Sequence, residues 1–405
     1  MNARSFLLAG TSILLALLLA EGFLRLAGVE PRYGMNWAPH PLLGHTGPRS
    51  EILQVGYDEA VYNRTGFRDV PTVEGPPLKP MPRIVVMGDS FTEAWSIYGR
   101  HVYTKKLERL LSIKSGLEYE VIAFGASDYG TAQELLAYNE YGRQFNPDIV
   151  LLQFFGLNDF LNNSIDFAFK NQGRSDFARP YLLYGEDAKK YPKHHEFDSL
   201  GYTYLESQGP TAPVRRFFRV NSRLYGLVES VIKSREWDKL NLLSPGDCSV
   251  ELELFLAERP GAWPKAVEIT ERLILSFKAV VGNRVAPEQL PKKYFKGQAP
   301  ILLGMYIPSA LEIKDDTWEK TVVKSLGKCF PGAAVDRLAG EKSFLSAFAK
   351  AGAPAFSLRE AFRRAHLAGV ELYLPDGHLT YDGHAVAAEA IRDFVLVEQK
   401  RALGQ

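Results

Sequence analysis

Arg83-Ile-Val-Val-Met-Gly-Asp-Ser-Phe-Thr-Glu-Ala94 is the stretch around which the rest of the chain can be arranged. Its apolar run, Ile84–Met87, is rich in β-branched residues, which is typical of a strand buried in a parallel sheet. Gly88 ends the run, and the next residues can begin a helix with Glu93 in its first turn, where negative charge is favoured. Ser90 therefore lies on a strand-to-helix turn, where an α/β protein can hold a nucleophile beside backbone amides. A turn that only caps a helix explains the same residues.

The composition sets broad limits on function. A chain of 405 residues can form one large domain or two modest ones, and its hydrophobic fraction of 46% is that of a globular protein. The 48 Lys and Arg residues balance 47 Asp and Glu residues, so the formal net charge is +1. This balance gives no reason to expect nucleic acid as a partner. The function must therefore come from a local site.

The N-terminus has the pattern of an export signal. The run Ser5–Ala20 carries no charge and follows Arg4, and amphipathic residues continue after Glu21. The run is shorter than the roughly 20 residues that span a bilayer, but the residues after it can extend the helix into the interface. Because Leu18-Leu19-Ala20 lacks a small-x-small cleavage pattern, we predict that residues 1–29 are a signal anchor rather than a cleaved signal peptide. The anchor would lie in the inner (cytoplasmic) membrane, with the main domain periplasmic or extracellular.

The rest of the chain alternates between strand and helix patterns. Residues 30–82 are rich in Pro, Gly and Asn and are predicted to form an extended linker that packs on the domain, with Asn63–Asp69 as a surface turn. The domain is predicted over 83–405. Apolar runs closed by small or polar residues predict strands at 84–87, 119–124, 149–155, 301–307 and 355–358. Apolar residues at helical spacing predict helices at 103–113, 131–141, 342–351, 359–367 and 385–399.

This alternation predicts an α/β fold with a parallel sheet. Residues from about 164 to 298 break the rhythm, and we predict a mostly helical insertion there, with helices at 214–234 and 263–281. All the conspicuous small and polar residues fall at the C-terminal ends of the strands. We therefore expect the functional site at that edge of the sheet, with the insertion beside it.

A serine nucleophile needs a base within hydrogen-bond reach and a group that orients the base. Of the eight histidines, His378 and His384 lie in a Gly-rich loop ahead of the last helix, each two residues after an aspartate. Asp382 is a natural N-cap for that helix, which would put His384 in the first turn, where the helix dipole disfavours imidazolium. We therefore prefer His378 as the base, with Asp376 as its orienting carboxylate.

The attacked carbonyl also needs hydrogen-bond donors for its oxyanion. The candidates are the backbone N–H groups of Ser90 and Gly125 and the side-chain amide of Asn158, each at the end of its own strand. A tight turn is the better explanation of Gly125 when it is taken alone.

No metal or organic cofactor is expected, since His194-His195 has no accompanying carboxylate pattern and is explained by a solvated loop. Cys248 and Cys329 are not in a Cys-x-x-Cys motif. They form a disulfide if the domain is exported and they meet in space; otherwise they are two buried thiols.

Four segments together resemble, in order, the four blocks of the SGNH (GDSL-type) hydrolase superfamily. They are Gly88–Phe91, Gly125, Gly156–Asp159 and Asp376–His378. The chain looks like the membrane-anchored bacterial branch, which often carries segments similar to Asn63–Asp69 and to Gly130–Glu134. The resemblance covers roughly residues 83–163 and 299–398. It implies a flavodoxin-like three-layer α/β/α sandwich.

By position, the resemblance implies Ser90 as the nucleophile, His378 as the base and Asp376 as its orienting residue, with Ser90, Gly125 and Asn158 as the oxyanion hole. It implies an exported esterase acting on an ester-bearing small molecule, a lipid or an O-acylated envelope glycan. One departure matters: the chain has Asp-x-His where Asp-x-x-His is commonest, a spacing that resembles polysaccharide O-acetyltransferases such as those acting on alginate. An O-acetyltransferase is therefore one alternative, and a glycan-binding or assembly protein without turnover is another.

Overall fold

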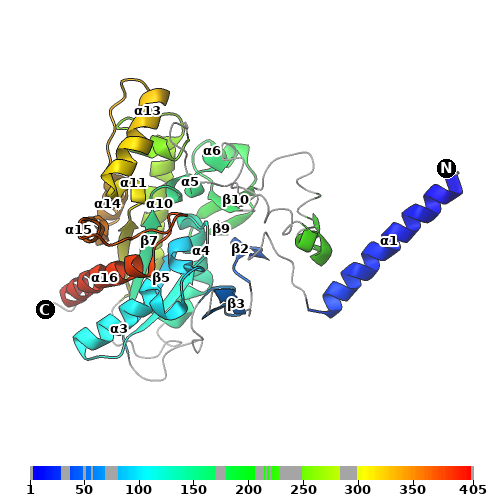
Figure 1. Cartoon of the computed structure of the whole chain (residues 1–405), viewed down its shortest axis with the longest axis horizontal. Helices are drawn as coiled ribbons and strands as arrows, with labels where there is room; N and C mark the ends of the chain where they lie inside the picture. The colour runs from blue at the N-terminus through cyan, green and yellow to red at the C-terminus, as the bar shows by residue number, and fades with distance from the viewer. Residues whose placement is uncertain are drawn as a thin grey trace.

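The computed structural model describes residues 3–28, 37–48, 52–55, 58–68, 81–168, 179–205, 214, 217–218, 221–228, 249–282 and 299–402. Its centre is a five-stranded sheet in which every neighbouring pair is parallel. The strands, in spatial order, are β12 (Ala355–Ser357), β11 (Ile301–Ile307), β7 (Ile149–Phe155), β5 (Arg83–Gly88) and β6 (Glu120–Gly125). Numbered along the chain this is the order 2-1-3-4-5, the flavodoxin-like arrangement. The predicted α/β fold is confirmed (Figure 1).

Alternate residues of the central strands enter two separate cores, one on each face of the sheet. Val85 and Met87 belong to one core, and their neighbours Ile84 and Val86 belong to the other. The helices packed on the first face are α4 (Thr131–Glu140), α10 (Trp263–Gly282) and α14 (Ala339–Lys350). Those on the second face are α3 (Tyr103–Ser115), α15 (Arg359–Leu367) and α16 (Tyr381–Ala402). This is the three-layer sandwich, and strands buried on both faces explain the unbroken apolar runs in the sequence.

Short helices connect these layers, and one long helix stands apart. The connecting helices are α2 (Ser90–Glu93), η1 (Gly99–His101), η2 (Gly142–Phe145), α5 (Asp159–Asn163), α6 (Ile165–Ala168), η3 (Leu252–Phe255), α11 (Ala310–Ile313), α12 (Asp315–Thr317), η5 (Trp318–Val323) and α13 (Lys324–Cys329). The long helix, α1 (Ala3–Leu26), projects away from the sandwich (Figure 1). Cys329 is disulfide-bonded, and Cys248, the only other cysteine of the chain, lies outside the described residues.

The segment predicted as a mostly helical insertion also contains an antiparallel sheet. Its strands, in the order β8-β10-β9, are β8 (Arg179–Leu182), β10 (Leu200–Leu205) and β9 (His195–Phe197), and α7 (Asp187–Lys190) lies between β8 and β9 in the chain. Asp198 and Ser199 both have positive φ, 49° and 62°, as the two-residue turn between β9 and β10. Positive φ at both positions is typical of a type I′ hairpin, which usually carries Asn-Gly or Asp-Gly. Asp-Ser lacks that signal, so the hairpin was not predicted.

The region before the domain forms two antiparallel hairpins, β1 (Ala38–His40) with β2 (Gly44–Thr46) and β3 (Ile52–Val55) with β4 (Asp58–Val61). The prediction of a surface turn at Asn63–Asp69 is wrong for two of its residues. Phe67 is fully buried, with its ring 5.0 Å from that of Phe124, and Arg68 is also buried. The Phe67 ring therefore packs into the first core.

Candidate active site

The turn after β5 is fixed by a buried glutamine from β7. Gln153 Oε1 accepts hydrogen bonds from Asp89 N, at 3.0 Å, and from Thr92 Oγ1, at 2.9 Å. A Cβ at Gly88 would lie 2.2 Å from Thr92 Oγ1 and 2.3 Å from Gln153 Oε1, so a larger residue would displace these two side chains. Asp89 is the N-cap of α2, and its Oδ1 accepts from Phe91 N at 2.9 Å. These contacts place Ser90 at the first helical position, at the C-terminal edge of the sheet.

Ser90 and His378 meet across this edge. The distance between Ser90 Oγ and His378 Nε2 is 2.9 Å, within hydrogen-bond reach, although 288 residues separate them in the chain. The His378 ring packs against Phe91, with ring centroids 5.2 Å apart. The loop that carries His378 is a tight turn, in which Leu374 N donates to His378 O at 2.7 Å and Gly377 has φ of +89°. Gly377 makes this turn possible because its left-handed backbone is unfavourable for other residues.

Asp376 lies on the far side of the imidazole. Its Oδ1 accepts from the His378 backbone N at 3.0 Å, and its Oδ2 lies 3.2 Å from His378 Nδ1. The second contact has the distance of an ion pair, but it lacks the alignment of a hydrogen bond. Burial disfavours the charged imidazolium, yet the Asp376 carboxylate, with Asp89 and Glu93 farther away, outweighs it and raises the pKa of His378. The contact with His378 in turn lowers the pKa of Asp376.

His384, the other candidate base, is elsewhere. It is buried against Tyr103, whose ring stacks on it at 5.9 Å, and its Nδ1 accepts from Tyr103 N at 3.2 Å. Burial lowers the pKa of His384 to about 3, so it is neutral at ordinary pH. The prediction of Asp382 as N-cap is wrong: α16 begins at Tyr381, and Thr380 Oγ1 accepts from Gly383 N at 3.0 Å. The preference for His378 agrees with this geometry.

The predicted oxyanion donors lie around the same turn. Asn158 ends the loop after β7, and its Nδ2 donates to Asp89 Oδ2 at 2.8 Å, which leaves its second N–H free to bind another acceptor. Gly125 ends β6 directly against α2, because a Cβ there would lie 2.3 Å from Glu93 N and 2.5 Å from Thr92 C. The close approach at Gly125 is therefore one between β6 and the helix that carries Ser90.

Three carboxyl groups are fully buried near this turn: Asp89, Glu134 on α4 and Asp159 on α5. Burial raises the pKa of each of them, and their mutual repulsion adds to the effect for Glu134 and Asp159. Asp89 is hydrogen-bonded, whereas neither carboxyl oxygen of Glu134 has a hydrogen-bond donor. Three buried carboxyl groups with raised pKa values therefore lie close to the turn that carries Ser90.

Sequence analysis missed several side chains that hold α2 in place. Arg68 donates to the carbonyl oxygens of Glu93, at 3.2 Å, Ala94 and Ile97, and so caps the C-terminal end of α2. Glu93 is buried and accepts from Tyr62 Oη at 2.7 Å and from Ser127 N at 2.6 Å. These partners come from the region before the domain and from the loop after β6, and no local pattern indicates them. A polar Gln153 inside an apolar strand is the one signal that could have been followed.

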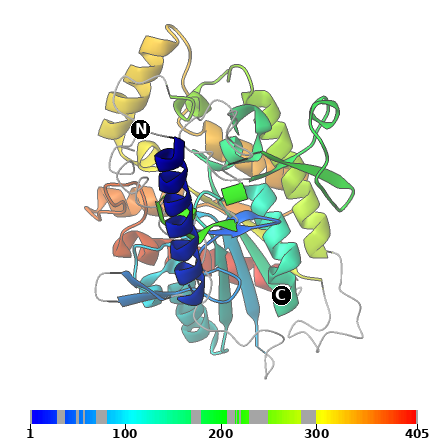
Figure 2. The ribbon, with the colours of Figure 1, turned by 90° about the vertical axis from the view of Figure 1, so that its right-hand side faces the viewer.

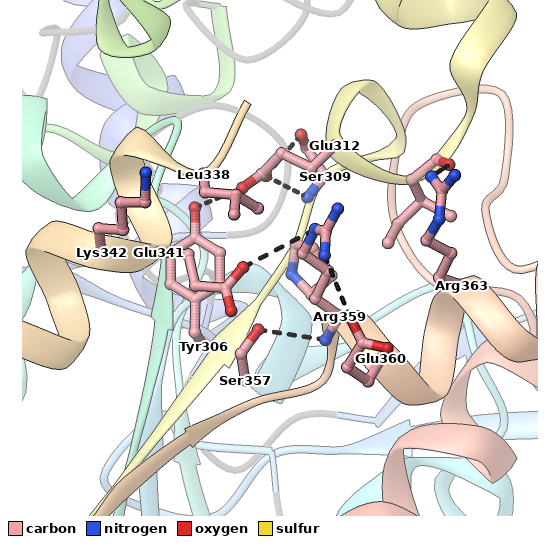
Figure 3. Close-up of polar contacts among 12 residues, drawn as sticks. Tyr306, Ser309, Glu312, Leu338, Glu341, Lys342, Ser357, Arg359, Glu360 and Arg363 are labelled. Atoms are coloured by element: carbon pink, nitrogen blue, oxygen red, sulfur yellow. Dashed lines mark hydrogen bonds and ion pairs between the residues drawn. The ribbon is translucent and has the colours of Figure 1, made fainter. Parts of the chain in front are cut away.

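A second polar cluster lies at the C-terminal end of β11. Figure 3 shows Tyr306 and Glu312 pointing toward each other, with 2.8 Å between Tyr306 Oη and Glu312 Oε1. Glu312 Oε2 also accepts from Ser309 N and Oγ, which forms a capping box for α11. Nearby, Arg359 lies between Glu341 and Glu360. Burial raises the pKa of Glu312 to about 7, and the hydrogen bonds of Glu312 join β11 to the start of α11.

In the described part of the chain, no group of three or more His, Cys, Asp or Glu side chains could hold a metal ion. His194 and His195 lie at the start of the β9–β10 hairpin. No geometry for a bound metal or cofactor follows from these residues.

Comparisons with known proteins find similarity only among solved structures, since no family model and no curated protein matches. A lipase/acylhydrolase from Enterococcus faecalis aligns with 78% of this chain and 95% of its own, at 12% identity and a TM-score of 0.37. The acetyl xylan esterase AlAXEase aligns with 77% of this chain and 99% of its own, at 12% identity and a TM-score of 0.37. LAE5, an α/β hydrolase enzyme from the metagenome of Lake Arreo, Spain, aligns with 80% and 96%, at 11% identity and a TM-score of 0.38. At such identity the likeness says nothing about individual residues.

Proposed function

We propose that this chain is an exported, membrane-tethered serine esterase of the SGNH type. The observation that carries the proposal is the 2.9 Å contact between Ser90 Oγ and His378 Nε2, with Asp376 behind the imidazole. Ser90 and His378 are 288 residues apart in the chain, and the fold does not require their side chains to be in contact at the edge of the sheet. Their meeting supports nucleophilic catalysis, in which a base takes the proton of the attacking serine.

The chemistry follows from this arrangement. Ser90 Oγ attacks the ester carbonyl while His378 Nε2 takes its proton, and Asp376 stabilises the resulting imidazolium. The Ser90 and Gly125 N–H groups and the free N–H of Asn158 are the proposed donors to the oxyanion. The tetrahedral intermediate breaks down to an acyl-enzyme as His378 returns the proton to the departing alcohol. Water, activated by His378, then releases the acid and restores Ser90.

The proposed substrate is an ester whose acyl group sits on an envelope glycan or a lipid. Transfer of the acyl group to a sugar hydroxyl is the second candidate, and the observation in its favour is the Asp376-Gly377-His378 spacing, which resembles that of polysaccharide O-acetyltransferases. Both candidates use the same acyl-enzyme and differ only in what resolves it. A role limited to glycan binding or assembly would need none of these contacts.

The proposed location rests on α1. Among the described residues, the stretch Leu8–Leu26 is the one helix long and apolar enough to cross a membrane, and none of it is buried in the molecule. We propose that α1 tethers the chain to the inner membrane, with the sandwich on the periplasmic or extracellular side.

The direct test is turnover of p-nitrophenyl acetate by the full chain in detergent, beside the Ser90→Ala variant. We expect Ser90→Ala to lower kcat by at least about 10³-fold, as loss of a serine nucleophile does elsewhere. Thermal unfolding of the two proteins should agree, since Ser90 is only half-buried. Addition of acetylated and free oligosaccharides then separates the two candidates, because a transferase acetylates the acceptor faster than it releases acetate. A folded wild type that turns over no ester and is not labelled by a fluorophosphonate would contradict both.

A further inference from the structure

The segment 214–228 of the insertion carries an exposed apolar surface beside α1. Five of its side chains are 42–61% exposed, far more than apolar side chains of the domain cores: Val214, Phe217, Phe218, Leu227 and Val228. We call these five side chains the apolar patch. Within the segment Phe218 stacks on Tyr225, with ring centroids 5.9 Å apart, so its aromatic residues form one packed unit. An exposed group of this kind marks a surface that contacts a membrane or another protein.

This segment is attached to α1 by a polar junction. Glu21 of α1 accepts hydrogen bonds from Arg223 N at 3.1 Å, Leu224 N at 3.0 Å and Ser222 Oγ at 2.9 Å. Arg25, one turn further along α1, pairs with Glu21 at 2.8 Å and donates to Asn221 O at 2.6 Å. Glu21 therefore caps the helical residues 223–228, as acidic side chains do at helix N-termini. In Figure 1 the described helical part of the segment lies between the sandwich and α1, near the end of α1 that faces the domain, and in Figure 2 it appears behind α1.

The junction sets the depth of the segment. Glu21 interrupts the apolar run of α1, and a carboxylate at that place belongs at the boundary between lipid and water. A segment hydrogen-bonded to Glu21 must lie at the same boundary. The sequence of the segment suits that place, because its apolar residues alternate with four arginines, Arg215, Arg216, Arg219 and Arg223, and it contains no acidic residue up to Val228. Basic segments with aromatic residues bind the interface of membranes that contain anionic lipids.

We infer that the described residues of this segment, 214, 217–218 and 221–228, lie in the membrane interface as a second contact, with the apolar patch inserted among the acyl chains of an anionic phospholipid bilayer. This inference rests on the proposed anchoring by α1. A transmembrane helix alone leaves the attached domain free to rotate and tilt. A second contact joined to α1 through Glu21 and Arg25 restricts that motion and fixes the orientation of the insertion relative to the lipid surface.

The test places a nitroxide label at single cysteines of the full chain in vesicles of phosphatidylethanolamine and phosphatidylglycerol. The probe positions are Phe218→Cys and Leu227→Cys, and the matched control is Lys189→Cys, an exposed position on α7 whose side chain is 75% accessible. Leu14→Cys in α1 reports the anchor itself, and the chain without new cysteines gives the background. Collision rates with oxygen, which concentrates in lipid, and with a water-soluble nickel chelate are compared.

We expect the ratio of oxygen to nickel collisions at residues 218 and 227 to exceed that at residue 189 at least severalfold and to lie below that at residue 14. Glu21→Gln should lower the ratio at residue 218, because it weakens the junction. A water-like ratio at residue 218 with a lipid-like ratio at residue 14 would overturn the inference and leave the anchor in place. Such a result is also what a protein partner on the patch would give, since these vesicles hold none. A water-like ratio at residue 14 would overturn the anchor and the inference together.

Discussion

Asp376 is half-exposed and poorly aligned with His378. Whether it raises the pKa of His378 and supports catalysis can be tested directly. Asp376→Asn removes the negative charge that raises the pKa of His378. We expect kcat/KM at its plateau to fall by about 10²-fold or more, toward the roughly 10⁴-fold loss known for a buried triad aspartate. Because His378 must be neutral to act as a base, a lower pKa also moves the acid limb of the pH profile to lower pH.

The matched control is Asp382→Asn, at the other aspartate that precedes a histidine by two residues. Its side chain lies on an exposed turn of α16, and His384 is buried and neutral, so we expect an unchanged pH profile. Profiles of kcat/KM for p-nitrophenyl acetate between pH 4.5 and 9 provide the measurement, since they report groups of the free enzyme. An acid limb that stays in place in Asp376→Asn would mean that Asp376 does not tune His378.

Glu134 predicts a pH dependence of stability. Burial raises its pKa in the folded state, so the folded chain holds a proton that the unfolded chain loses above about pH 4.3. The contribution of Glu134 is therefore fully present below that pH and declines as pH rises, by at most about 1.4 kcal/mol per pH unit. Glu134→Gln keeps the shape without the titration. We expect the free energy of unfolding of the wild type, relative to this variant, to fall between pH 5 and 8.

Urea unfolding at several pH values measures this difference. Glu140→Gln, at the exposed end of the same helix, should give no such trend. Parallel pH profiles for wild type and Glu134→Gln would show that Glu134 ionises freely in the folded chain.

At this scale the sequence predicted what lies within one motif. Ser90 and Asn158 were chosen because turn residues at strand ends gather at one sheet edge. Asp376 and His378 were chosen as an Asp-x-His pair in the loop ahead of the last helix, and in the structure His378 contacts both Ser90 and Asp376. Arg68 and Gln153 support them from outside those motifs. Arg68 binds backbone carbonyl oxygens, and Gln153 lies on a neighbouring strand. No spacing of residues along the sequence predicts contacts of this kind.

At the scale of elements, α2 is a four-residue helix whose position depends on its neighbours. Gly125→Ala would place a Cβ 2.3 Å from Glu93 N and 2.5 Å from Thr92 C, which are backbone atoms that cannot rotate away. Either β6 or α2 must shift, at a cost of about 1–3 kcal/mol in the free energy of unfolding. Since α2 carries Ser90, we also expect kcat/KM to fall by about 10²-fold, as a 1 Å misplacement can cause.

Gly327→Ala is the matched control, because no atom would lie within 4 Å of the new Cβ in α13. It should stabilise the chain by up to about 1 kcal/mol through helix propensity and leave turnover unchanged. Equal thermal stability and turnover in Gly125→Ala and wild type would mean that the contact between β6 and α2 is loose.

Some strands could be predicted from the sequence and others could not, depending on whether their residues form a recognisable pattern. Strands β5, β7 and β11 were predicted almost to the residue because burial on both faces demands an unbroken apolar run. The β9–β10 hairpin was missed because its turn is Asp198-Ser199, which carries no glycine. About half of the helix predicted at 214–234 lies outside the described residues, and of the described ones 214, 217–218, 221 and 223–228 are helical.

At the scale of the whole molecule, the two cores close the sandwich without any contribution from α1. None of the membrane-length part of α1 is buried, and Leu14 and Leu15 are 59% and 57% exposed. The domain should therefore fold and act independently of the apolar character of α1. A chain with both Leu14→Lys and Leu15→Lys tests this separation, since each lysine at the centre of a membrane helix costs roughly 2.5–3.5 kcal/mol.

We expect the double variant to keep its turnover of p-nitrophenyl acetate in detergent within about twofold. It should float with phospholipid vesicles much less than the wild type at high salt, where surface charge contacts are screened and only the apolar patch would remain to hold the chain. Leu111→Lys provides the opposite control: Leu111 is fully buried in the second core, and a lysine there should lower thermal stability sharply. A double variant that still floats at high salt would show that α1 is not what holds the chain in the membrane. Loss of turnover without loss of flotation would instead mean that the active site depends on Leu14 and Leu15, although both are exposed in the folded molecule.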